Sequence, residues 1–189
     1  QFITYHDYIH PHDEDYSAKG MDVYDVLTRK KIGDVYGECK LSSNGKLTGG
    51  TLYNCDTNEL MTMKAGQAGI TAVTAPIVVY KAKCEDGAGD TLNARVNIVN
   101  TSGKKISNIV YKVYALDKSG NVLSCTAEGD TEQNLNMPTA VAAGETNETF
   151  WRGFMTNANG ASLKFEQVTI TYADGTSQTV PASKIAFAC

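Results

Sequence analysis

Several features that define common protein classes are absent from this 189-residue sequence. It has no uninterrupted apolar stretch of about eighteen residues, the length that a membrane-spanning helix needs, so no transmembrane segment is expected. Four prolines and 17 glycines without a short repeat exclude a collagen-like fibre. Seventeen basic against 21 acidic residues give a net charge of -4, whereas a nucleic-acid-binding domain needs a basic face. The composition indicates a globular protein that does not bind nucleic acid.

Motifs of the common catalytic classes are missing as well. No Cys-x-x-Cys pair occurs, which argues against a zinc ribbon or a thioredoxin-like site. There is no Gly-x-Ser-x-Gly nucleophile elbow. All the histidines, His6, His10 and His12, lie near the N-terminus, so the rest of the chain has no imidazole to activate a serine or cysteine. Carboxylate catalysis stays open as a distant alternative, and we expect a protein that is not an enzyme.

The odd number of cysteines leaves at least one thiol outside any intrachain disulfide. Asn44-Gly45 is a strong signal for a two-residue hairpin turn, which would pair residues whose numbers add to 89. Cys39 would then lie opposite Gly50, so a bridge to Cys55 is not expected. The other three continue apolar strand faces, where buried thiols are expected and one disulfide among them is the alternative. These three are Cys84, Cys125 and Cys189.

Composition and patterning divide the chain into four parts. Residues 1–22 form a polar arm, and the first 25 residues carry six acids against one lysine, so the remaining chain has a net charge of about +1. Short strands and tight turns over 23–65 predict a small β-hairpin subdomain. The small, weakly patterned residues 66–75 are interpreted as a linker. Residues 76–189 form the main domain.

The main domain is predicted to be all-β. Residues 92–100 alternate apolar and polar side chains, and 106–117 and 122–127 are further expected strands. A polar loop is expected over 128–147. The alternation changes phase near Gln167, which indicates a β-bulge. About seven strands with regularly spaced turns predict an immunoglobulin-like β-sandwich.

Four stretches of this domain occur in an order typical of one group of domains. They are Asn100–Ile106 (NTSGKKI), Val113–Gly120 (VYALDKSG), Trp151, and Tyr172–Gly175 (YADG). Over about residues 76–181 the chain resembles the Ig-like, FxLYD-type accessory domains of exported proteins from Gram-positive bacteria. The resemblance implies a sandwich fold, an extracellular or cell-envelope location and no catalytic residues. The start at Gln1 rather than Met fits a processed mature protein or a cut segment.

The N-terminal arm carries the residues with the most metal-binding chemistry. His6, His10 and His12 precede three consecutive acids, and imidazole with nearby carboxylates suits zinc or copper. Pro11 disfavours a helix at His10, so a solvated acidic arm without bound metal is the simpler expectation.

Two aromatic residues, Trp151 and Phe154, are candidates for a platform that binds sugar rings. Phe150 lies on the opposite face of the same expected strand, so one of these rings must pack inward, and we expect Trp151 to do so. The sequence therefore predicts a non-catalytic, exported or cell-surface module that supports structure or binds a protein or glycan. Metal binding by the histidine arm is the alternative.

Overall fold

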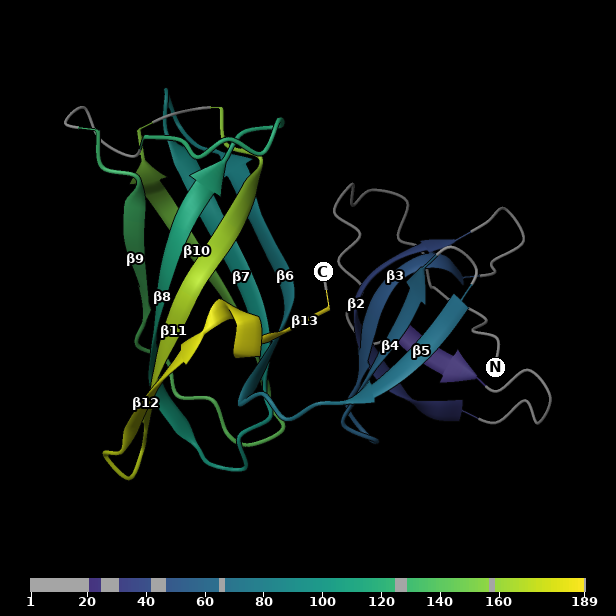
Figure 1. The fold of residues 1–189 in the computed structure, drawn as a ribbon. Helices are drawn as coiled ribbons and strands as arrows, with labels where there is room; N and C mark the ends of the chain where they lie inside the picture. The colour runs from purple at the N-terminus through teal and green to yellow at the C-terminus, as the bar shows by residue number, and fades with distance from the viewer. Residues whose placement is uncertain are drawn as a thin grey trace. The chain divides into compact units, whose positions relative to one another are not determined.

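The computed structural model describes residues 21–24, 31–41, 47–64, 67–124, 129–156 and 159–188. The chain divides into two compact units, which are described separately: 1–74 together with 186–189, and 75–185. The described residues form strands and a single short 3₁₀ turn, η1 (Ala182–Lys184) (Figure 1). Within these ranges no helix has the length and apolar character needed to cross a membrane. The predicted all-β class is confirmed.

The first unit is a five-stranded antiparallel meander in which each strand pairs with the next along the chain. Residues Val35 to Lys40 pair with Asn54 to Gly49, and every pair adds to 89. Cys39 thus faces Gly50, as the hairpin register predicted. The strands are β1 (Met21–Tyr24), β2 (Lys31–Leu41), β3 (Leu47–Asn54), β4 (Glu59–Lys64) and β5 (Gln67–Ala72).

Strand β5 corrects one sequence interpretation, because most of the expected linker 66–75 belongs to the sheet. Lys64 to Glu59 of β4 pair with Gln67 to Ala72 without a break in register. The segment is small and uncharged with little alternation, so nothing local marks it as a strand. The segment forms a strand because it pairs with β4, although its own sequence does not indicate a strand.

The turn between β3 and β4 is held by two asparagines. Asn54 Oδ1 accepts a hydrogen bond from the Asp56 amide at 2.9 Å. Asn58 adopts a left-handed backbone, with φ of 53°, and its Nδ2 donates to Val73 O at 3.1 Å. Its Oδ1 accepts from the Tyr53 hydroxyl at 3.0 Å, and burial raises the pKa of Tyr53 to about 12. Side-chain hydrogen bonds thereby fix the turn that sets the β3–β4 register.

Residues 75–185 form a sandwich of two sheets, ordered β10-β7-β6 and β12-β11-β8-β9, and β13, from residues 186–187, joins the first of these sheets beside β6 (Figure 1). One sheet contains β6, β7 and β10, which are the first, second and fifth strands of this domain. The other contains β8, β11 and β12, which are the third, sixth and seventh. That is the immunoglobulin-like arrangement, so the predicted fold class is confirmed. The strands are β6 (Ile77–Asp86), β7 (Leu92–Asn100), β8 (Ile106–Leu116), β9 (Glu132–Met137), β10 (Thr146–Met155), β11 (Ser162–Tyr172), β12 (Ser177–Pro181) and β13 (Ala186–Phe187).

Burial alternates along β8 and β11, whereas in β7 it alternates only in the first half, because Val96 to Asn100 are all buried. In β7 the expected inward residues Leu92, Ala94, Val96 and Ile98 are all buried. The β8–β11 register shifts between Phe165 and Gln167, which confirms the expected bulge.

Two expectations about the connections were wrong. The loop expected over 128–147 contains strand β9, which pairs with β8. Only Leu135 and Met137 alternate inward in β9, which is too short an apolar pattern to indicate a strand. The strand expected over 122–127 is reduced, in its described part, to one bridge between Val122 and Leu116, and Val122 is 46% exposed.

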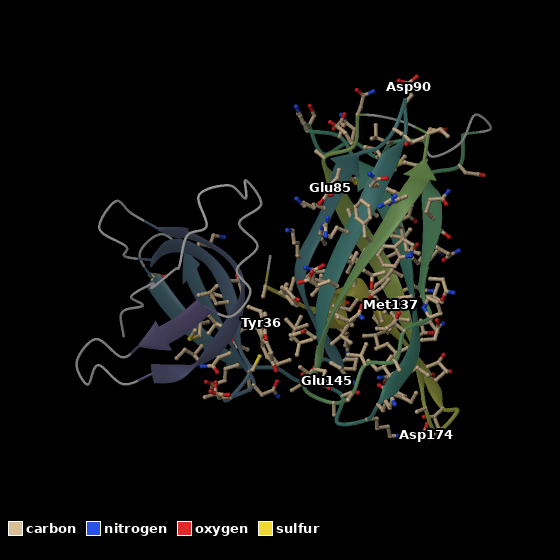
Figure 2. The ribbon with its side chains drawn as sticks, turned by 180° about the vertical axis from the view of Figure 1, so that it is seen from behind. Tyr36, Glu85, Asp90, Met137, Glu145 and Asp174 are labelled. Atoms are coloured by element: carbon tan, nitrogen blue, oxygen red, sulfur yellow. The ribbon has the colours of Figure 1, made fainter. Side chains whose placement is uncertain are left out.

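The loops at one end of the sandwich converge on Asn100, which is fully buried. Its Nδ2 donates to Lys104 O at 2.8 Å, Val141 O at 3.0 Å and Ala142 O at 3.1 Å. Its Oδ1 accepts from the Ser102 hydroxyl at 2.7 Å. The backbone of Asn100 also pairs with the turn at Gly144 and Glu145. Figure 2 shows Glu145 and Asp174 at this end and Asp90 at the other.

Candidate functional site

A group of polar side chains gathers on the outer face of the sheet β12-β11-β8-β9. Lys112 Nζ lies 2.8 Å from Glu132 Oε2 and 3.1 Å from Glu166 Oε2. The Tyr114 hydroxyl donates to Glu166 Oε2 at 2.9 Å. The residues come from three adjacent strands, β8, β9 and β11. We call Lys112, Tyr114, Glu132 and Glu166 the bulge cluster.

The β-bulge in β11 places Glu166 in this cluster. Phe165 pairs with Val113 and Gln167 with Lys112, so Glu166 is the extra residue opposite the regular β8 ladder. A bulge bends the strand and redirects the side chain of the extra residue. Glu166 consequently reaches both Lys112 and Tyr114.

The inward neighbours of the cluster fix its backbone. Tyr111 and Val113 of β8 are fully buried, and Phe165 of β11 is 6% exposed. The ring of Tyr111 meets that of Phe165 edge-on, with 5.9 Å between the centroids. Since inward and outward residues alternate along each strand, the packing that orders the core also positions the cluster on the outer face.

Hydrogen bonds within the bulge cluster shift the pKa values of three of its residues, and the shifts favour charged Lys112, charged Glu166 and neutral Tyr114. Hydrogen bonds to Glu132 and then Glu166 raise the pKa of Lys112. Hydrogen bonds from Tyr114 and Lys112 lower the pKa of Glu166, and the bond to Glu166 raises the pKa of Tyr114. General acid catalysis by a carboxyl group needs a raised pKa, the opposite of the shift at Glu166. The arrangement suits hydrogen bonding to a ligand better than proton transfer.

A second polar row crosses the outer face of the other sheet. Arg95 donates to both carboxylate oxygens of Glu85, with distances of 2.8 and 3.3 Å, and Lys83 lies 3.0 Å from Glu85. Chiefly because of the Arg95 hydrogen bond, the pKa of Glu85 falls to about 2. The Arg95 guanidinium also lies 4.8 Å from the centre of the Phe150 ring. Figure 2 labels Glu85 in this row.

Both aromatic candidates contact the sandwich itself. Trp151 is half-buried, its Nε1 donates to Asn136 O at 2.8 Å, and its ring meets Tyr111 edge-on at 5.8 Å. Phe154 is partly buried against a core cluster that includes Leu92 and Met155. Trp151 thus links β10 to the opposite sheet, in agreement with an inward role. Sugar binding by either ring stays a prediction.

The histidines fall outside the described part of the chain. No structure is described for His6, His10 and His12, so zinc or copper binding there stays a prediction. Within the described ranges, no three His, Cys, Asp or Glu residues form a group able to hold a metal ion. Cys84 Sγ donates to Ser162 O at 3.4 Å, while Cys125 and Cys189 lie outside the described residues.

Sequence reasoning did not find the bulge cluster, although one signal for it was present. The phase change near Gln167 located the bulge, and the extra residue of a bulge is a natural functional candidate. Glu132 had no such signal, because its segment was interpreted as a loop. The Tyr114–Glu166 contact joins residues 52 positions apart.

Comparisons with known proteins give one distant likeness. No protein-family model matches the chain, and no curated protein does. Among solved structures, the chain is similar to the crystal structure of a DUF1425 family member from Shewanella sp. pv-4. The identity is 17% and the TM-score 0.33, over 72% of this chain and 97% of that one. The comparisons indicate no catalytic family.

Proposed function

We propose that this chain is a non-catalytic binding module whose sandwich recognises a polar partner, a glycan or a protein, through the bulge cluster. The observation that carries the proposal is the placement of Glu166 by a β-bulge beside Lys112 and Tyr114. Bulges are over-represented where a strand presents a functional side chain. The cluster offers an ammonium donor, carboxylate acceptors and a tyrosine ring on one sheet face.

The surroundings of the cluster support a polar ligand. Asn134 lies opposite Lys112 on β9 and is exposed, and Lys164 lies opposite Tyr114 on β11 and is exposed. Tyrosine combines apolar contact area with a hydroxyl, so it contributes to both sugar and protein recognition. Side chains held on strands also lose less freedom on binding than side chains on loops do.

An extracellular or cell-envelope location belongs to the same proposal. Its support is the resemblance of residues 76–181 to domains of exported proteins. Such modules meet glycans and proteins of the cell surface, which are the two partner classes proposed here.

The experiment is a paired screen of the full chain on a glycan array and a cell-surface protein array. Tyr114→Phe removes one hydroxyl from the cluster. Deletion of Glu166 removes the bulge, and the inward alternation of Phe165 and Val168 then becomes regular, so the fold should persist. Thr179→Ala is the matched control, because Thr179 lies on the same sheet face, where its hydroxyl bonds Thr169 at 3.0 Å.

The expected result is a ligand whose binding falls at least about tenfold in Tyr114→Phe and in the deletion, but not in Thr179→Ala. Two results would overturn the proposal: a ligand that binds all variants equally, or no ligand on either array.

A metal-binding role for the N-terminal arm is the second candidate, and it is favoured by the clustering of His6, His10 and His12 beside acids. Calorimetric titration with zinc and copper would compare the native chain with a variant lacking residues 1–13. Equal heats for the two proteins would end this hypothesis.

A further inference from the structure

Strand β5 is one of the two outer strands of the first sheet, and its sequence lacks the usual protection of an exposed edge. Gln67–Ala72 contains no charged residue and no proline, and its register with β4 has no bulge. Natural proteins block open edges with charges, prolines, bulges or covering side chains, because an open edge templates pairing with another strand.

Three edges of the sandwich show such protection. The register between β10 and β7 shifts between Trp151 and Met155, so the ladder of this edge strand is irregular there. Strand β12 ends at Pro181. On β9 the carbonyl of Asn136 already accepts the indole hydrogen bond. Among the described residues, strand β5 shows none of these devices, so its edge differs from these three.

The hydrogen-bonding pattern of the β4–β5 pair shows which backbone amides and carbonyls of β5 face away from β4. The Val73 amide donates to Asn58 O at 2.9 Å, and these residues continue the β4–β5 register. In an antiparallel pair, hydrogen-bonded positions alternate along each strand. Residues 67, 69 and 71 therefore bond β4, while the amides and carbonyls of Ala68, Ile70 and Ala72 point away from the sheet.

A row of apolar side chains ends at the same place. One row of paired positions runs across β2, β3, β4 and β5, so its members share one face of the sheet. The row consists of Gly37, Leu52, Met61 and Ile70. Leu52 is fully buried, and Ile70 is 54% exposed. The apolar row continues to Ile70 on β5, which is the last strand of this sheet among the described residues.

We infer that β5 pairs in antiparallel fashion with β5 of a second copy of this chain. The outward groups of residues 68, 70 and 72 fit one symmetric register, in which Ile70 lies opposite Ile70 of the partner subunit. Residue 68 of each copy then lies opposite residue 72 of the other. This register engages all the outward groups at once and packs the two Ile70 side chains together.

A second copy suits this edge better than an arbitrary strand for two reasons. The segment is uncharged, so two copies meet without like-charge repulsion. The contact is also isologous, so it uses each open β5 edge once and closes as a dimer instead of growing into a fibre. Because a six-residue strand buries little area, the dimer is expected to be weak, with a Kd on the order of 100 µM.

The test is sedimentation equilibrium of the full chain over a concentration series up to about 1 mM. The native chain should show a monomer–dimer equilibrium. Ile70→Lys places two like charges opposite each other in the paired strands and should weaken the dimer at least about tenfold. Thr57→Lys adds the same charge to an exposed turn of the same unit and should leave the Kd unchanged.

Amide hydrogen exchange supplies the second readout. Raising the protein concentration should slow exchange at residues 68, 70 and 72, with little change at 69 and 71, which already bond β4. A monomer at every concentration overturns the inference, as does a dimer that Ile70→Lys leaves intact. Protection that rises equally at odd and even positions also overturns it.

Discussion

Replacing Asn100 with aspartate tests whether a buried amide holds the loops of the sandwich together. Asn100 is fully buried, and the two hydrogens of its Nδ2 are shared among the carbonyl oxygens of Lys104, Val141 and Ala142 at 2.8–3.1 Å. Asn100→Asp keeps the shape and the Oδ1 acceptor. It replaces the donor with a carboxylate oxygen that faces three carbonyl oxygens.

The expected loss of stability at pH 7 is about 4 kcal/mol. A lost donor leaves buried acceptors unsatisfied at about 1–3 kcal/mol, and an uncompensated buried charge adds to this. For a unit of this size the loss corresponds to a fall in Tm of about 15 °C. Burial raises the pKa of the introduced carboxyl above its unfolded value, so the penalty should shrink as the pH falls and the protonated group donates one hydrogen bond.

Trp151 makes the measurement specific to the sandwich, because it is the only tryptophan and it packs against buried Tyr111. Urea unfolding followed by its fluorescence would be recorded at pH 7 and near pH 4 for the native chain and Asn100→Asp. Ser102→Ala, which removes one partner of the Asn100 oxygen, serves as the control with an expected loss of about 1 kcal/mol. A loss below about 1 kcal/mol for Asn100→Asp at pH 7, or one that grows toward low pH, would refute the reasoning.

Three further predictions concern single contacts. The pKa of Glu85, about 2 beside Arg95, lies below its ordinary 4.5, so ionised Glu85 adds stability above pH 4.5 that is lost as the pH falls toward 2. Glu85→Gln should cost about 1 kcal/mol at pH 7 after allowing for solvent screening, and its urea stability should meet that of the native chain near pH 2. Trp151→Phe should cost at least about 1 kcal/mol in urea unfolding followed by tyrosine circular dichroism, because the indole bond to Asn136 is lost. Asn58→Ala should destabilise the first sheet by about 1 kcal/mol more than Asn58→Gly in hydrogen exchange, since φ is 53° there.

Where a strand carries its own pattern, the sequence was sufficient to predict it. The alternation over residues 92–100 predicted both the strand and its inward face, although the other face is buried as well from Asn97 onward. The register of residues 35–40 agrees with the one predicted from a two-residue turn at Asn44-Gly45, although it shifts next to the turn, where Leu41 pairs with Leu47. That register placed Cys39 at Gly50, as observed.

The sequence analysis did not predict strands that form mainly because they pair with a neighbouring strand. Strand β5 has small, uncharged residues, and β9 has only Leu135 and Met137 facing inward. Neither has enough apolar surface to indicate a strand locally, and each is held by a ladder to one partner, β4 or β8. Such edge strands are set by pairing, which a single sequence does not display.

For the candidate site, the local sequence pattern predicted the position of the bulge but not the residues that Glu166 contacts. The phase change at Gln167 indicated a bulge, and a bulge must leave one residue, Glu166, outside the regular ladder. What Glu166 touches depends on which strand lies alongside, and that strand, β8, lies in another part of the sequence. Its partners Lys112 and Tyr114 lie on the face of their strand opposite Tyr111 and Val113, and the local sequence pattern does not mark them as a site. The bulge therefore marks the place of the site in the sequence, and sheet topology supplies its chemistry.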